Sequence, residues 1–297
     1  MIFLQVILPV LLVFSAGFAL QRKFHLHIKS VSSVTVYIFI PALVFHTFYI
    51  TPIDLEYAMV AGAFLALTLL LIGLVRLYSW IRQASQSKES GLVLANAFMN
   101  VGNYGTPLVL FAYGQEGFQF AVSVMVLGTV MMNTLGVYFA ARGQSGAKAA
   151  VKQLFAIPAV YTMLLAILWR QSALPLPVNF LQAIEILANA AIPTVMVVLG
   201  MQLADLKLEK FAWESIGFSV IAKLVLSPLM MAAILHFLPI SPLYEKVLIV
   251  LAGMPTAATT TMYALQFDAE PQMVSSITLI TTLLSAVNLT AILWLLG

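Results

Sequence analysis

The sequence contains no cysteine among its 297 residues, and it has few charged residues. Without cysteine, the chain cannot form disulfides, thiolate metal sites or cysteine nucleophiles. Charged residues make up 8% of the chain and hydrophobic residues 62%, whereas a soluble domain carries roughly 25% charged residues. A water-facing surface cannot be built from this composition, so we expect an integral membrane protein without a large soluble domain.

The motifs of common enzyme and metal sites are also missing. The sequence has no His-Glu-x-x-His and no P-loop. The segment Gly143-Gln-Ser145-Gly146 resembles a rhomboid serine motif in letters only, because no histidine is suitably placed in the later hydrophobic segments. His25 and His27 lie in a basic loop without further ligands and do not make a metal site. We therefore expect no enzyme, no metal site, no cofactor and no nucleic-acid partner.

Ten hydrophobic segments approach the length of about 20 mostly apolar residues that a membrane span needs. The first has no basic stretch before it and no small-residue cleavage site, so we expect a retained helix and not a signal peptide. The expected spans are residues 2–20, 31–50, 57–79, 92–113, 118–140, 154–170, 179–201, 211–238, 246–266 and 272–296.

The basic residues predict the orientation, because lysine and arginine concentrate in cytoplasmic loops. Eleven of them lie in or next to the first, third, fifth and seventh loops, and only Arg170 and Lys246 lie in the alternate loops. The odd-numbered loops are therefore expected in the cytoplasm, and both termini outside it. We expect a multi-pass protein of the cell membrane, the plasma or inner membrane, in contact with lipid.

Proline recurs at a nearly fixed offset between the two halves of the chain. Since each half has five spans, an odd number, the second half would enter the membrane from the opposite face as an inverted repeat. The expected units are residues 1–141, a cytoplasmic linker at 142–153, and residues 154–297. The alternative is that the prolines kink unrelated helices. The pairs are Pro9 and Pro158, Pro41 and Pro193, and Pro107 and Pro255, with separations of 149, 152 and 148 residues.

Two of these prolines follow small residues, in Gly105-Thr106-Pro107 of the fourth span and Gly253-Met254-Pro255 of the ninth. Proline removes a backbone donor, and lipid cannot satisfy the freed groups, so a break must face protein or water. The sequence predicts that both spans are broken at these positions and that the breaks cross. Helix N-termini at such a crossing attract anions, and helix C-termini present carbonyls to a cation.

Polar and small residues around the two breaks form the candidate substrate site. Span four supplies amides and span nine supplies hydroxyls, while an asparagine lies near mid-depth in each following span. The alternative is structural, because small residues also pack helices and threonine bonds to its own helix. The candidates are Asn100, Asn103, Tyr104, Gly105, Thr106, Pro107, Asn133, Gly253, Pro255, Thr256, Thr259 and Asn288.

Lys223 is the one clear ionisable residue deep in an expected span. Burying an unpaired ammonium is costly, so it should meet carbonyls, a carboxylate or a cavity. We expect it to stand in for a bound sodium ion and to support the crossing. Snorkelling to the interface is the alternative, over about 18 Å from the start of the span.

The chain resembles the auxin efflux carrier family, in its bacterial branch. The resemblance rests on the asparagine-rich segment 96–114, on Lys223-Leu-Val-Leu-Ser-Pro228, and on the stretch from Gly253-Met-Pro255 to Asp268-Ala-Glu-Pro271. It implies ten helices in two inverted five-helix repeats with crossed, broken helices 4 and 9, similar to sodium/bile-acid and sodium/proton transporters. It also implies a scaffold of helices 1, 2, 6 and 7, a moving transport domain of helices 3–5 and 8–10, elevator-type motion and a homodimer.

The expected function is secondary or facilitated transport of a small organic anion, such as malate, malonate or an auxin-like acid. The coupling ion, if there is one, is left open between Na⁺ and H⁺. The alternatives are a sodium-coupled importer of a neutral or anionic solute, an ion channel and an intramembrane enzyme. No carboxylate lies clearly at mid-membrane, which argues against an aspartate-driven proton antiporter.

Overall fold

The computed structural model describes residues 2–51, 55–141, 157–172, 174–205 and 212–297, and this part of the chain is helical without any β-strand. The predicted linker at 142–153 lies outside the described residues. Seven helices are long and apolar enough to cross a membrane, which confirms a multi-span membrane protein. They are Phe3–Phe24, Ile28–Ile50, Leu55–Ile81, Val101–Ala140, Val178–Asp205, Trp213–Leu235 and Pro271–Leu296.

Several of these spans contain a π-helical turn between α-helical parts. In the first half of the chain the order is η1 (Phe3–Ile7), α1 (Leu8–Phe24), α2 (Ile28–Val34), η2 (Thr35–Phe39), α3 (Ile40–Ile50), α4 (Leu55–Ile81), α5 (Gln86–Ala97), η3 (Val101–Gly105), α6 (Thr106–Met131), η4 (Met132–Gly136) and α7 (Val137–Ala140). In the second half it is α9 (Pro158–Gln171), α10 (Val178–Asp205), α11 (Trp213–Val220), η5 (Ile221–Leu226), α12 (Ser227–Leu235), α13 (Pro242–Ala252), α14 (Thr259–Gln266) and α15 (Pro271–Leu296).

The seven spans differ from the ten predicted ones for identifiable reasons. The stretch Val101–Ala140 holds parts of two predicted spans, separated by a sharp bend at Gly114, whose φ of 69° suits glycine. The predicted ninth span is divided into α13 and α14, and α9 has 14 residues. Ten spans and the inverted repeat therefore stay predictions.

The predicted position of the first break was wrong. The chain is helical from Val101 onward, and Pro107 lies in the first turn of α6. Proline is well tolerated there because the N–H that it lacks has no partner in the first turn. The non-helical segment lies earlier, at Phe98–Asn100, where α5 ends. The second break was predicted correctly, since residues 253–258 separate α13 from α14.

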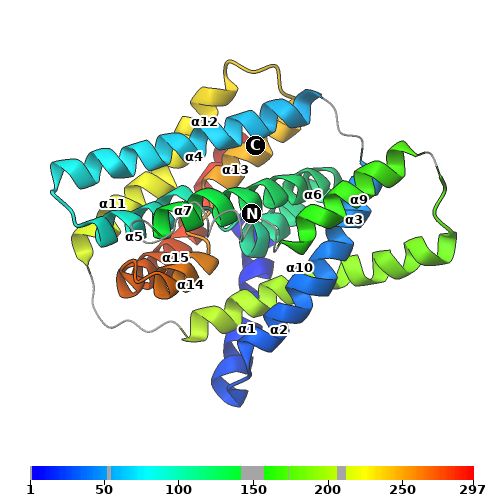
Figure 1. Ribbon diagram of the computed structural model, residues 1–297, viewed down its shortest axis with the longest axis horizontal. Helices are drawn as coiled ribbons and strands as arrows, with labels where there is room; N and C mark the ends of the chain where they lie inside the picture. Colours follow the sequence, from blue (N-terminus) through cyan, green and yellow to red (C-terminus); the bar gives the residue numbers. More distant parts are fainter. Residues whose placement is uncertain (1, 52–54, 142–156, 173, 206–211) are drawn as a thin grey trace.

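Helices from the two halves of the chain pack closely on one side of the molecule. α1 lies along α10, and α3 contacts both α9 and α10 (Figure 1). The approach of α1 to α10 needs glycine: a Cβ on Gly17 would lie 2.2 Å from the Val197 oxygen, and one on Gly200 would lie 2.0 Å from the Phe14 oxygen. In Figure 1, α4, α5 and α11 lie on the other side of the molecule, together with α14 and α15.

Candidate functional site at two interrupted helices

The two interruptions lie against each other as a short antiparallel pairing. Met99 and Thr256 form an isolated β-bridge. The N–H of Asn100 donates to the Pro255 oxygen at 2.9 Å, and the N–H of Ala257 donates to the Phe98 oxygen at 3.1 Å. Backbone groups at each break thus form hydrogen bonds with backbone groups of the other. These bonds are needed because a membrane interior has no water to satisfy the groups.

Side chains satisfy the carbonyls at the two helix C-termini that meet here. At the end of α5, the Thr256 hydroxyl donates to the Ala95 oxygen at 2.7 Å. At the end of α13, the Ser227 hydroxyl donates to the Ala252 oxygen at 2.7 Å, and the Asn288 amide donates to the Gly253 oxygen at 3.4 Å. The last carbonyls of a helix have no partner within that helix, so these contacts allow the ends to be buried.

Lys223 satisfies a further carbonyl at the C-terminal end of α5. It lies in the π-helical turn η5, its side chain is fully buried, and its Nζ donates to the Asn96 oxygen at 3.0 Å. The expected contact with a carbonyl is therefore present, and the snorkelling alternative is excluded. A cation at a helix C-terminus is stabilised by the helix dipole as well as by the hydrogen bond. The Asn96 side chain is held nearby by Ser219, whose Oγ accepts from Nδ2 at 2.9 Å.

A cavity of about 770 Å³ extends from the crossing toward helix ends that carry Lys29 and Asp205. Its walls come from the helix termini at both breaks, from α4 and α6, and from α2, α9 and α10. Four of the predicted site residues line it: Asn100, Asn103, Asn133 and Thr259. Lys29 and Asp205 are the charged residues among those of the described chain that line the cavity.

Two helix N-termini face this cavity. In the helix that begins with η3, the N–H of Val101 donates to the Met99 oxygen and that of Gly105 to the Asn100 oxygen, and Gly102 and Asn103 lie between these two donors. In α14, the N–H of Thr260 donates to the Ala257 oxygen, and Thr259 precedes it. Free N–H groups in a first turn suit an anion, and Gly102, Asn103 and Thr259 all line the cavity.

Asn100 adds a side-chain donor between these termini. The residue is 4% exposed, and its Nδ2 has no hydrogen-bond partner in the described chain. A buried donor without a partner costs about 1–3 kcal/mol. Such a donor in a cavity wall is suited to a ligand that brings an acceptor.

Asn133 and Tyr263 form a polar pair in the same wall. The Tyr263 hydroxyl donates to the Asn133 Oδ1 at 2.6 Å, and the Asn133 Nδ2 donates to the Thr129 oxygen at 2.8 Å. Asn133 lies in the π-helical turn η4 and Tyr263 in α14. These two bonds fix the orientation of the Asn133 amide.

The other predicted site residues lie behind the cavity wall and pack the crossing. Tyr104 is fully buried and meets Phe14 edge-on, with ring centroids 5.0 Å apart. A Cβ on Gly105 would lie 2.7 Å from the Leu251 Cδ2, and one on Gly253 would lie 2.5 Å from the Ile292 Cδ1. The remaining residues of this group, none of which lines the cavity, are Thr106, Pro107, Pro255, Thr256 and Asn288.

Several cavity residues were missed by the sequence analysis. Tyr263 and Gln266 line the cavity from the same face of α14 as the predicted Thr259, since the spacing of four and three residues along 259, 263 and 266 is that of a helix face. This polar stripe after the second break could have been found from the sequence. Gln202 at the end of α10 carries no comparable signal, because its place depends on how the two halves pack. In the described chain, no group of three His, Asp or Glu residues could hold a metal ion.

An all-helical chain with seven apolar spans and a polar cavity beside two paired helix interruptions has the features of a multi-span membrane transporter. Residues 2–293 match the family model described as "Membrane transport protein", and the chain therefore belongs to this family, that of the auxin efflux carriers. The resemblance inferred from the sequence is thus confirmed.

Curated relatives agree with this assignment. The chain is 27% identical over 268 residues to an "Uncharacterized transporter" of Methanothermobacter thermautotrophicus, which covers 88% of this chain and 86% of the relative. It is 28% identical over 279 residues to a "Putative malonate transporter" of Rhizobium meliloti, covering 88% and 84%. A similar transporter of Methanocaldococcus jannaschii is 25% identical over 267 residues, covering 87% and 86%. The family and these relatives are transporters and not enzymes, as expected.

Proposed function

We propose that this protein carries a small organic anion across the cell membrane and binds it at the crossing of the two interrupted helices. The observation that carries the proposal is the unpartnered Asn100 amide in a cavity wall between two helix N-termini. Backbone N–H groups of Gly102, Asn103 and Thr259 would supply further donors to a carboxylate. Asp205, the one carboxylate among the described residues that line the cavity, lies at the C-terminal end of α10 and accepts from the Gln21 amide.

The substrate class that fits is a mono- or dicarboxylate. Ligand pockets are commonly about 300–1,000 Å³, and the cavity of about 770 Å³ leaves room for a malonate-sized anion with water or for a larger aromatic acid. The relative named as a malonate transporter supports a dicarboxylate. Tyr263 would act as a donor to a second carboxylate by exchanging its bond to Asn133 for one to the substrate.

The cavity lies between two groups of helices, which supports an elevator-type mechanism. One wall comes from α2, η2, α9 and α10, and the other from α4, α6, η4 and both breaks. The first group belongs to the predicted scaffold of helices 1, 2, 6 and 7, where the glycine contacts between α1 and α10 would keep the packing rigid. The second belongs to the predicted transport domain of helices 3–5 and 8–10, carrying the site. The ten-helix, inverted-repeat topology and a homodimer are part of this proposal.

The orientation follows from the basic loops, with both termini outside the cytoplasm. The end of the cavity at Lys29 would then face the cytoplasm, so this conformation would be open inward. An inside-negative potential favours anion export by about 2.3 kcal/mol per charge per 100 mV, whereas import needs a coupled Na⁺ or H⁺.

Lys223 favours a carrier without sodium over the sodium-coupled importer. Its ammonium occupies the C-terminal end of α5, where a carbonyl-bound cation would otherwise stabilise the crossing. On this hypothesis the Lys223 Nζ takes the place of a cation that a sodium-coupled relative would bind from solution.

Counterflow in liposomes tests the function and the site together. We expect saturable uptake of at least one labelled monocarboxylate, dicarboxylate or indole acid, with the same rate in sodium and choline buffers. Asn103→Ala should abolish this uptake while the protein stays folded, whereas Thr290→Ala, on α15 and outside the cavity, should not. Non-saturable flux would indicate a channel, and full activity of Asn103→Ala would refute the site.

A further inference from the structure

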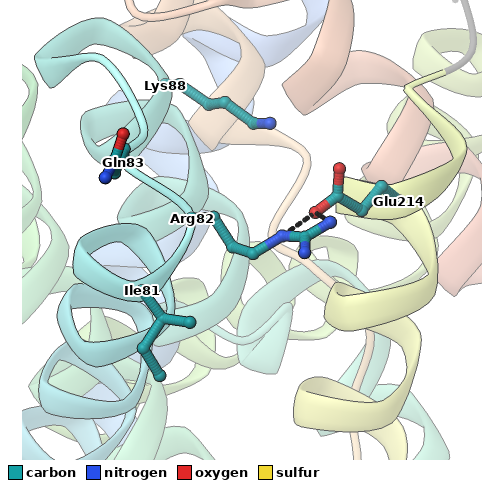
Figure 2. Close-up of a pocket in the computed structure, with 5 residues that line it drawn as sticks. All are labelled: Ile81, Arg82, Gln83, Lys88 and Glu214. Carbon is teal, nitrogen blue, oxygen red and sulfur yellow. Dashed lines mark hydrogen bonds and ion pairs between the residues drawn. The ribbon is translucent and has the colours of Figure 1, made fainter.

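A second hollow lies at the end of α5 opposite the crossing, where the ends of two membrane spans meet. It has a volume of about 340 Å³ and is lined by Ile81, Arg82, Gln83, Lys88 and Glu214 (Figure 2). Ile81 ends the span Leu55–Ile81, and Glu214 follows the first residue of the span Trp213–Leu235. The hollow therefore lies at the depth of the lipid headgroups, and the transport site does not include it.

The side chains around the hollow provide positive charge that is only partly neutralised. Arg82 donates from Nε to the Glu214 Oε1, and Tyr78 donates to the same oxygen at 2.9 Å. Lys88 is half-buried and has no ion pair with any residue of the described chain, and Figure 2 shows its ammonium extending toward the space beside Arg82 and Glu214. Two cations therefore face one carboxylate.

Arg82 keeps donors for a further acceptor. A guanidinium has five N–H donors in a planar fork, and only Nε and Nη2 approach Glu214. Hydrogen bonding to Glu214 raises the pKa of Arg82, so the arginine stays charged at every physiological pH. Planar donors of this kind suit a phosphate.

Large apolar side chains are exposed at Ile81, which lines the hollow, and at Trp80 and Trp213, which are next in sequence to lining residues. Trp80 is 77% exposed, Ile81 is 62% exposed and Trp213 is 67% exposed. Tryptophan is enriched at the membrane–water interface, where its ring lies among the headgroups. Basic pockets between spans at this depth suit anionic headgroups.

From the charge of the hollow and its depth, we propose that it binds the headgroup of an anionic phospholipid, with the phosphodiester between Arg82 and Lys88 and the acyl chains beside Trp80 and Trp213. The site joins α4, α5 and α11, so a bound lipid would hold the ends of these helices together. This binding does not depend on which solute the protein transports.

Quenching by brominated lipids tests the proposal directly. The chain has four tryptophans, and the changes Trp169→Phe and Trp294→Phe leave only Trp80 and Trp213, which are next in sequence to the lining residues Ile81 and Glu214. In vesicles of phosphatidylcholine with a small fraction of brominated phosphatidylglycerol, quenching gives the relative affinity for the anionic lipid. Each basic side chain near the surface contributes about a fivefold preference, so with two cations and one opposing carboxylate we expect a preference of about 5- to 25-fold in the parent protein.

The variants separate a specific site from general attraction. Arg82→Gln with Lys88→Gln should remove the preference, and Lys88→Gln alone, which breaks no ion pair in the described chain, should lower it about fivefold. The matched control, Arg22→Gln with Lys23→Gln at the exposed end of α1, should retain it. Glu214→Gln should strengthen lipid binding, because the competing carboxylate is gone. If the ion pair between Arg82 and Glu214 were purely structural, Glu214→Gln would instead weaken lipid binding as much as Arg82→Gln.

Three outcomes would overturn the proposal. The first is equal quenching by brominated phosphatidylglycerol and phosphatidylcholine in the parent protein. The second is a preference that survives the double change, or that the control loses equally. The third is full reversal of quenching by soluble glycerol 3-phosphate, which would indicate a site for free phosphate and not for lipid.

Discussion

The change Asn100→Ala removes one donor from the cavity wall and should separate binding from folding. The Asn100 Nδ2 is buried without a partner in the described chain, so its loss relieves a penalty of about 1–3 kcal/mol in the empty protein. The backbone bond from Asn100 to Pro255 is kept, because alanine also has an N–H. We therefore expect the stability of the empty protein to be unchanged or slightly higher.

Substrate affinity should respond in the opposite direction. A hydrogen bond to a charged acceptor contributes about 1.5–3 kcal/mol, so the loss corresponds to about a 10- to 150-fold higher Kd. Asn100→Asp, which is nearly the same size, should bind no anion at measurable concentration because its carboxylate repels the substrate. Calorimetric titration with the transported anion, together with thermal unfolding of the empty protein, measures both effects. An unchanged Kd in Asn100→Ala would refute the reasoning.

Two further predictions concern the crossing itself. Lys223→Met is unbranched and only one atom shorter, but it leaves the Asn96 oxygen without its donor, at a cost of about 1–3 kcal/mol. We expect transport at least tenfold slower or newly dependent on sodium. Unchanged kinetics at every sodium concentration would reject the role of the lysine. Because the natural chain has no cysteine, Met99→Cys with Thr256→Cys provides a clean cross-link. The two residues are a non-hydrogen-bonded antiparallel pair, with Cα atoms about 4.5 Å apart, so mild oxidation should join the two cysteines and stop transport. The control, Met99→Cys with Thr260→Cys, should form far less disulfide. Equal cross-linking of both pairs would argue against the pairing of Met99 with Thr256.

The membrane class and several residues of the cavity wall could be predicted from the sequence, because lipid imposes strict rules on composition. A run of apolar residues predicts a span, and asparagine, lysine or paired glycine and proline within it predict an interior polar site. Lys223 is an example: its buried side chain was expected to contact a carbonyl, a carboxylate or a cavity, and its Nζ donates to the Asn96 carbonyl oxygen. Asn100, Asn103, Asn133 and Thr259 were likewise predicted near one site and line one cavity.

The exact position of the first break could not be predicted from local signals. Pro107 suggested a break, but proline also begins helices, and here it lies in the first turn of α6. Phe98 and Met99 carry no breaking signal; their extended backbone is stabilised by pairing with residues 255–257 of the other half. Such long-range pairing is decided by the packing of the two halves, and the same holds for Gln202 in the cavity wall.

The most direct measurement uses two neighbouring threonines in the first turn of α14. Thr259 is exposed in the cavity, whereas Thr260 is fully buried. In the purified protein, Thr259→Cys should react quickly with a water-soluble maleimide, and a transported carboxylate should slow the reaction in proportion to its occupancy. Thr260→Cys should react slowly with or without the carboxylate. If the transported anion leaves the labelling rate of Thr259→Cys unchanged at saturating concentration, the solute does not bind where the two interrupted helices meet.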